Sequence, residues 1–217
     1  MSTTAPVAAP PARRVSYSKP ILWTLMALGL LSVLILTEYP YFAHPNPNRD
    51  RVFSEKLAFL PHALAGLTAL IIGPFQFSTR LRQGNLARHR ILGKTYVIAV
   101  ILSALTALII SHHLDKVDQP ETYIFWETVA QAGLWLITTL AAFITARNRH
   151  IAAHRQWMIR SYIITFVFVT SRIPEPWPIV QHMSDAGFTI FLFLLLIASI
   201  IAPDIYFSWK ELTRPRS

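Results

Sequence analysis

Six long runs of apolar residues with almost no charge restrict the folds that this chain can adopt. They cover approximately residues 21–37, 57–77, 91–111, 123–145, 157–171 and 186–202. An α-helix needs about 20 mostly apolar residues to cross the hydrocarbon core of a bilayer, and in lipid its backbone must satisfy its own hydrogen bonds. The sequence therefore predicts an all-α fold, a polytopic bundle of six transmembrane helices.

The composition agrees with a membrane protein. Of 217 residues, 53% are hydrophobic and only 14% are charged, whereas soluble domains carry roughly 25% charged residues. The chain has no cysteine, which excludes disulfides, thiolate-bound metals and cysteine nucleophiles. Any metal or haem would have to be bound by histidine, methionine or carboxylate ligands.

The charged residues are divided between the two sides of the predicted membrane. Fifteen of the twenty Lys and Arg lie before the first run, around the connections after the second and fourth runs, and after the sixth, while nine of the eleven acids lie on the other side. Because cytoplasmic loops are enriched in Lys and Arg, both termini are predicted to be cytoplasmic. Topology thus accounts for the net charge of +9, and we expect the lipid bilayer, and no nucleic acid, as partner.

The domain organisation follows from these runs. Residues 1–19 are rich in Ala and Pro and contain no acid, which predicts a disordered cytoplasmic tail. Residues 20–204 form the predicted membrane domain, and residues 205–217 a second cytoplasmic tail.

Two histidines are predicted to lie at one depth of the bundle. His89 and His154 precede the third and fifth runs, which enter the membrane from the same side, and each is followed by an arginine, Arg90 or Arg155. Imidazoles that face each other in a bundle can bind one haem iron axially, and nearby arginines can neutralise its propionates.

We therefore predict a b-type haem with His89 and His154 as iron ligands and Arg90, Arg155 and Arg160 as propionate partners. Gly93, one turn after His89, would let a flat ring approach. The alternative is that both histidines bond to headgroups or loop carbonyls and that the arginines only follow the topology.

A second polar group is predicted in the opposite half of the membrane. His62 lies near the start of the second run and Glu127 near the start of the fourth, with Gln131 and Arg172 close by. Ionisable groups at membrane depth are costly and usually serve a function. This group predicts a proton relay, a quinone site or a small metal site, and the alternative is a His62–Glu127 pair that joins two helices.

The chain resembles one family in an ordered set of short motifs. The set consists of Pro61-His62, Gly73-Pro74-Phe75-Gln76, Arg82, the stretch from His89 to Tyr96, the stretch from Ala153 to Tyr162, and Arg172. This combination resembles the bacterial predicted membrane proteins called domain of unknown function 2306. The resemblance implies a multi-pass protein of the bacterial inner membrane and brings no established activity.

In helix number and paired histidines the family is also similar to the cytochrome b561-like di-haem proteins, an analogy of architecture only. This chain has no histidine in its fourth run, so only the His89/His154 pair carries over.

Three functions remain open from the sequence. The first is a redox or electron-transfer component, a membrane oxidoreductase if it is an enzyme, with a quinone or a redox protein as partner. The second is a proton-coupled carrier centred on His62 and Glu127. The third is a non-catalytic accessory subunit whose arginines bind a partner or anionic lipid.

Overall fold

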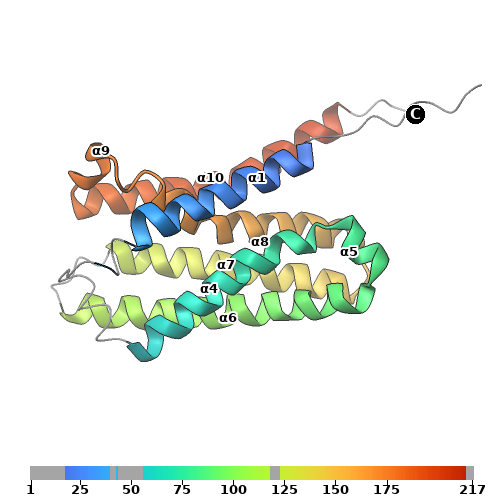
Figure 1. The fold of residues 1–217 in the computed structure, drawn as a ribbon, viewed down its shortest axis with the longest axis horizontal. Coiled ribbons are helices and arrows are strands. Elements are labelled where there is room, and N and C mark those ends of the chain that lie inside the picture. The colour runs from blue at the N-terminus through green and yellow to red at the C-terminus, as the bar shows by residue number, and fades with distance from the viewer. Residues whose placement is uncertain (1–17, 40–42, 44–55, 118–122, 214–217) are drawn as a thin grey trace, which may run out of the picture.

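A computed structural model describes residues 18–39, 43, 56–117 and 123–213 of the protein. Within these residues the chain forms helices and turns and no strand, which confirms the all-α class. The elements are α1 (Ser18–Val33), the π-helical turn η1 (Leu34–Glu38), α4 (Lys56–Gln76), α5 (Thr79–Gly84), α6 (Leu86–Val117), α7 (Tyr123–Arg147), α8 (Ile151–Arg172), α9 (Pro178–Gln181) and α10 (Asp185–Leu212) (Figure 1). The predicted tail 1–19 lies outside the described residues except for its last two positions.

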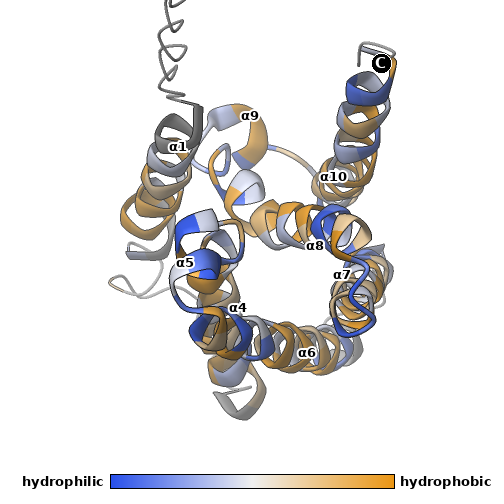
Figure 2. Cartoon of the chain, turned by 90° about the vertical axis from the view of Figure 1, so that its right-hand side faces the viewer, coloured by the Kyte–Doolittle hydropathy of each residue, from blue (hydrophilic) through white to orange (hydrophobic). Residues whose placement is uncertain are grey.

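Four of these helices form a ring at the centre of the molecule (Figure 2). α4 packs on α6, α6 on α7 and α7 on α8, and α8 closes the ring against α4. α6 and α8 therefore face each other across the bundle, and so do α4 and α7. α10 packs mainly on α8, and α1 also contacts α8, so these two helices lie outside the ring (Figure 1).

Four described helices are long and apolar enough to cross a membrane. By length and composition they are Ala58–Gln76, Leu86–His113, Tyr123–Arg147 and Asp185–Leu212. The multi-pass membrane protein is thus supported, whereas the count of six and the side on which the termini lie stay predictions. The first predicted span corresponds to a shorter apolar helix, Trp23–Leu36. The fifth predicted span lies in α8, which is not among these four helices. α8 is less apolar than they are because it carries the hydroxyl and cationic side chains described below.

Two helices begin earlier than the apolar runs suggest. The Asn85 side chain accepts a hydrogen bond from the backbone N–H of Arg88 at 2.9 Å and so caps the start of α6. α8 begins at Ile151. As a result, His89 and His154 stand on helices rather than in loops, and helix geometry fixes the direction of their side chains.

α4 and α6 make the most extensive contact in the ring, and small residues lie within it. Ala65 and Ala69 lie one turn apart on α4 and are buried. A Cβ added to nearby Gly66 would lie 3.3 Å from the hydroxyl of Ser103 on α6. Small residues let two backbones approach closely, which is how helices pack in the absence of a hydrophobic driving force between them.

A network of buried hydroxyls joins the other helices of the ring. The Tyr96 hydroxyl on α6 lies 2.8 Å from both Ser161 Oγ and Thr165 Oγ1 on α8. From α7, Trp135 Nε1 donates to Thr165 Oγ1 at 2.8 Å, and Thr139 Oγ1 lies 2.7 Å from Ser161 Oγ. All five side chains are buried.

Donor counting assigns a direction to every bond in this network. Thr165 donates its single proton to the Ser161 carbonyl at 2.9 Å, so it accepts from both Trp135 and Tyr96. Tyr96, having donated to Thr165, accepts from Ser161, which in turn accepts from Thr139. Each hydroxyl in this network donates one hydrogen bond, and so does the Trp135 N–H, so none of the five side chains has an unsatisfied donor.

The first prediction tests this network. Replacement of Thr165 with Val keeps the side-chain shape but leaves Tyr96 O–H and Trp135 N–H without their acceptor. Buried donors without acceptors destabilise by about 1–3 kcal/mol each, and membrane hydrogen bonds average about 0.6 kcal/mol, so we expect a loss of about 1–3 kcal/mol. Reversible unfolding in mixed micelles measures it.

Thr68→Val is the matched control, since the Thr68 hydroxyl bonds only to the Leu64 carbonyl of its own helix, at 2.7 Å. It should change stability by less than about 0.5 kcal/mol. Equal losses for the two variants would contradict the role given to the network.

Candidate functional site

A cavity of about 460 Å³ lies where the C-terminal ends of α4 and α7 meet the N-terminal ends of α6 and α8. We call it the histidine cavity. Apolar side chains, among them Phe77, Leu86, Ile151 and Met158, form part of its wall. Its polar lining residues are Gln76, Arg82, His89, Arg90, Arg149, His154 and Arg155. The volume is in the usual range for a small-molecule site.

His154 has a fixed orientation in this wall. Its Nδ1 lies 2.8 Å from the backbone carbonyl oxygen of Ala142 on α7. A carbonyl can only accept, so Nδ1 carries a proton, and in the neutral ring the lone pair is on Nε2. Metal-binding histidines are commonly oriented in this way by a second-shell carbonyl.

His89 enters the cavity from α6, the helix that faces α8 across the ring. Its Nδ1 is buried and has no hydrogen-bond partner among the described residues. Native structures leave few buried polar groups without a partner, so this nitrogen is a candidate ligand-binding atom. The two histidines thus line one cavity from facing helices.

Gln76, the last residue of α4, also belongs to the cavity. Its side chain is buried, and its Nε2 has no partner among the described residues. Its Oε1 would lie 3.1 Å from a Cβ added to Gly93. The space beside Gly93, expected to admit a flat ring, is therefore occupied by this amide.

The cavity collects positive charge from four separate elements. Arg82 comes from α5, Arg90 from α6, Arg149 from the turn between α7 and α8, and Arg155 from α8. No acidic residue belongs to the lining that the structure describes. Such a set of donors suits an anionic ligand, because guanidinium groups pair with carboxylates and phosphates.

Arg160, predicted to join this group, lies elsewhere. Its guanidinium forms an ion pair with Asp204 of α10, with Nε 3.0 Å from Oδ1. It also stacks over the rings of Trp157 and Phe207, at 5.1 and 5.2 Å from the ring centroids. Arg160 therefore joins α8 to α10 and is not among the residues that line the cavity.

The second predicted group is dispersed in the other half of the bundle. His62 Nδ1 lies 2.9 Å from the Ser103 carbonyl of α6, so this histidine joins α4 to α6. Glu127 on α7 is 3% exposed, and its Oε1 has no partner in the described part of the chain. Gln131 is half-buried one turn further along α7. Among the described residues no hydrogen bond or ion pair joins His62 to Glu127: His62 bonds to α6, and Glu127 lies on α7, across the ring from α4.

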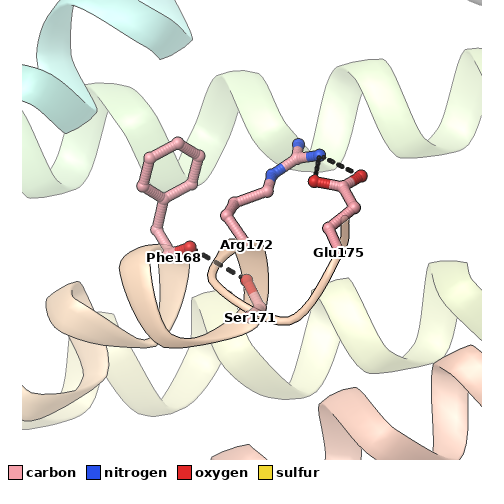
Figure 3. A network of polar contacts seen from close by, with 4 residues as sticks. All are labelled: Phe168, Ser171, Arg172 and Glu175. Carbon is pink, nitrogen blue, oxygen red and sulfur yellow. Dashed lines mark hydrogen bonds and ion pairs between the residues drawn. The ribbon is translucent and has the colours of Figure 1, made fainter. Parts of the chain in front are cut away.

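Arg172, at the end of α8, is directed to a glutamate of the following turn (Figure 3). Its Nη1 lies 3.0 and 3.1 Å from the two carboxylate oxygens of Glu175. The guanidinium also lies 5.7 Å from the centre of the Phe168 ring. Next to it the Ser171 hydroxyl donates to the Phe168 carbonyl at 2.9 Å (Figure 3). These contacts order the end of the helix.

Comparison with known proteins adds one match. The model of a family described as predicted membrane protein (DUF2306) matches residues 59–207. The chain belongs to this family. No curated protein and no solved structure matches the chain. The DUF2306 segment contains every residue that lines the histidine cavity as well as His62 and Glu127.

Three polar cavity residues of this DUF2306 chain are absent from the set of site residues that the sequence predicts: Gln76, Arg82 and Arg149. Gln76 could have been found as the only amide in a long apolar run beside Gly73-Pro74. Arg82 belongs to the motif set that carries the family resemblance, which is the signal that singles it out. Arg149 lies in a basic connection whose charge the topology already explains, so the sequence gives no signal that separates it from its neighbours.

The close contact between α4 and α8 at Gly73 yields the second prediction. A Cβ at Gly73 would lie 2.1 and 2.2 Å from two ring carbons of Tyr162. That ring is buried, and its hydroxyl donates to the Leu70 carbonyl at 3.1 Å. We expect Gly73→Ala to destabilise the DUF2306 fold by about 1–3 kcal/mol through overpacking, measured by unfolding in detergent.

Gly133→Ala serves as its control. Nothing lies within 4 Å of a Cβ at this α7 position, so the helix should gain about 0.5–1 kcal/mol from the substitution. A Gly73→Ala protein as stable as the Gly133→Ala protein would show that the Tyr162 ring does not press on α4.

Proposed function

We propose that the protein binds a b-type haem in the histidine cavity and serves as a redox or electron-transfer component of the bacterial inner membrane. The observation that carries the proposal is that His89 and His154, from facing helices of a four-helix ring, line one cavity together with four arginines. Cofactor sites in helix bundles are built from side chains on facing helices in this way.

The donor set fits a haem. His154 keeps its Nε2 lone pair free because Nδ1 is held by the Ala142 carbonyl. His89 has a buried ring nitrogen with no partner in the structure. The two imidazoles would hold the haem iron, and Phe77, Leu86 and Met158 would supply apolar surface to the porphyrin.

The arginines support the same proposal. A b-type haem carries two propionates, and guanidinium groups bind carboxylates with strong, charge-assisted hydrogen bonds. Arg90 and Arg155 fill this role as the sequence suggests. Arg82 and Arg149 also line the cavity, whereas Arg160 is paired with Asp204. We therefore replace Arg160 by these two residues in the proposed site.

A bound haem would supply one-electron chemistry, and the protein would supply ligands, orientation and charge. With His89 and His154 as the residues that hold it, the haem would serve in electron transfer. A quinone or a redox protein would be the electron partner. Any quinone- or proton-linked chemistry would take place near His62 and Glu127, in the half of the bundle opposite the histidine cavity.

The third prediction tests haem binding. We expect the full-length protein, purified in mild detergent from haem-supplied cells, to show the sharp reduced-minus-oxidised bands of a six-coordinate b-type haem. His154→Ala and His89→Ala should each remove most of the bound haem, because each deletes an iron ligand. Visible spectroscopy and the haem-to-protein ratio measure both effects.

His182→Ala is the control, since His182 is exposed beyond α9 and does not line the cavity. It should keep the wild-type spectrum. A colourless wild-type protein from haem-replete cells, or an unchanged spectrum in both ligand variants, would contradict the proposal.

One observation favours a second function, a proton-coupled carrier. Glu127 is 3% exposed, and its Oε1 has no partner among the described residues. A buried carboxyl group at membrane depth that forms no ion pair within the described part of the chain is costly to keep, and such groups are common in proton-coupled transport.

The fourth prediction addresses this carrier. If Glu127 binds the transported proton, Glu127→Gln should abolish proton uptake into proteoliposomes under an imposed gradient while preserving the fold. Glu211→Gln, at an exposed position of α10, should leave any uptake unchanged. Equal proton uptake in the wild-type and Glu127→Gln proteins would rule out this function for Glu127.

A further inference from the structure

The turn between α7 and α8 holds an arginine in a conformation that favours glycine. Arg149 has φ of 62°. Its N–H donates to the Ala146 carbonyl at 3.1 Å, and the N–H of His150 donates to the Thr145 carbonyl at 2.9 Å. This pair of bonds is the Schellman motif, in which the left-handed residue is usually glycine because a Cβ there crowds the backbone.

The arginine gains no ion pair that would explain its presence. Arg149 is exposed at the rim of the histidine cavity, and no carboxylate pairs with it in the part of the chain that the structure describes. Strained backbone positions persist where the side chain serves a function. The side chain of Arg149 lines the cavity, which is where such a function would be exerted.

Gln76 gives an independent sign of a ligand at the same place. Its side chain is 7% exposed, it lines the cavity, and its Nε2 has no hydrogen-bond partner within the described residues. The partner that this amide lacks must be a hydrogen-bond acceptor, because an NH₂ group only donates.

We propose that Arg149 and Gln76 are ligand-binding residues that donate hydrogen bonds to an oxyanion, a carboxylate or phosphate group, in the histidine cavity. This inference deepens the proposed function, in which the oxyanion is a haem propionate. The same donors would hold a phosphate if the ligand were an anionic lipid headgroup or free phosphate.

The experiment compares stability with ligand binding in the full-length protein. In neutral detergent without added ligand, Arg149→Gly should raise the melting temperature by about 2–4 °C, because glycine adopts the left-handed conformation without strain. The same variant should weaken haem retention by about tenfold or more, the scale expected for loss of a hydrogen bond to a charged group. Gln76→Leu should weaken haem retention without changing the α7–α8 turn.

Arg147→Ala is the matched control, because it removes a neighbouring positive charge that is not part of the lining. It should leave haem retention unchanged. The inference would be overturned if Arg149→Gly and Gln76→Leu both retained haem normally and both kept any rise in melting temperature that added phosphate gives the wild-type protein. An equal loss in Arg147→Ala would also overturn it, since charge alone would then explain the effect.

A second measurement separates this inference from the haem proposal. The melting temperature is recorded with inorganic phosphate and in micelles that contain phosphatidylglycerol or phosphatidylcholine. A colourless protein that phosphate or phosphatidylglycerol stabilises, with the effect lost in Arg149→Gly and Gln76→Leu, would end the haem proposal and support the oxyanion site. Stabilisation by phosphatidylglycerol but not by inorganic phosphate would identify a lipid headgroup, whereas a colourless protein that responds to neither would overturn both proposals.

Discussion

The hydroxyl of Thr165 is the contact on which the arrangement of the ring depends. It accepts from Tyr96 of α6 and Trp135 of α7 and donates within α8, so it fixes the rotation of three helices at once. Residues seven apart share a helix face. His154 and Ser161 therefore point the same way, and so do His89 and Tyr96. The buried network thus turns both histidines inward, and the cavity follows from a hydrogen-bonding requirement set two turns deeper in the membrane.

Part of the candidate site could be predicted from the sequence. The apolar runs show that helices exist, and the two His-Arg pairs at the mouths of parallel runs indicate that His89 and His154 could share a depth. Arg160 could not be placed, because its partner Asp204 is distant in sequence and the choice between cavity and α10 is made by packing. Arg149 was equally hidden, since a left-handed arginine in a basic connection has no sequence signature.

Each half of the bundle contains a histidine that bonds through Nδ1 to a neighbouring helix. His62 and His154 both present Nδ1 to a backbone carbonyl of a neighbouring helix, which fixes the ring and leaves Nε2 available. In the half that holds the cavity, the facing helix α6 supplies a second histidine. In the other half, α4 faces α7, which supplies the carboxyl of Glu127 instead. The chemistry open to each half is set by which residue stands across the ring.

The ion pair between Arg160 and Asp204 bears on how the protein is assembled in the membrane. α10 follows α8 in the chain, and parts of a protein fold while the chain emerges from the ribosome. Of the contacts described above for Arg160, those with Asp204 and Phe207 come from α10, and the one with the Trp157 ring lies within α8. Docking of Asp204 then neutralises a cation on the outer surface of the completed ring. α10 thus covers Arg160 in the folded protein, and a chain in which α10 did not pack on α8 would expose this guanidinium to lipid.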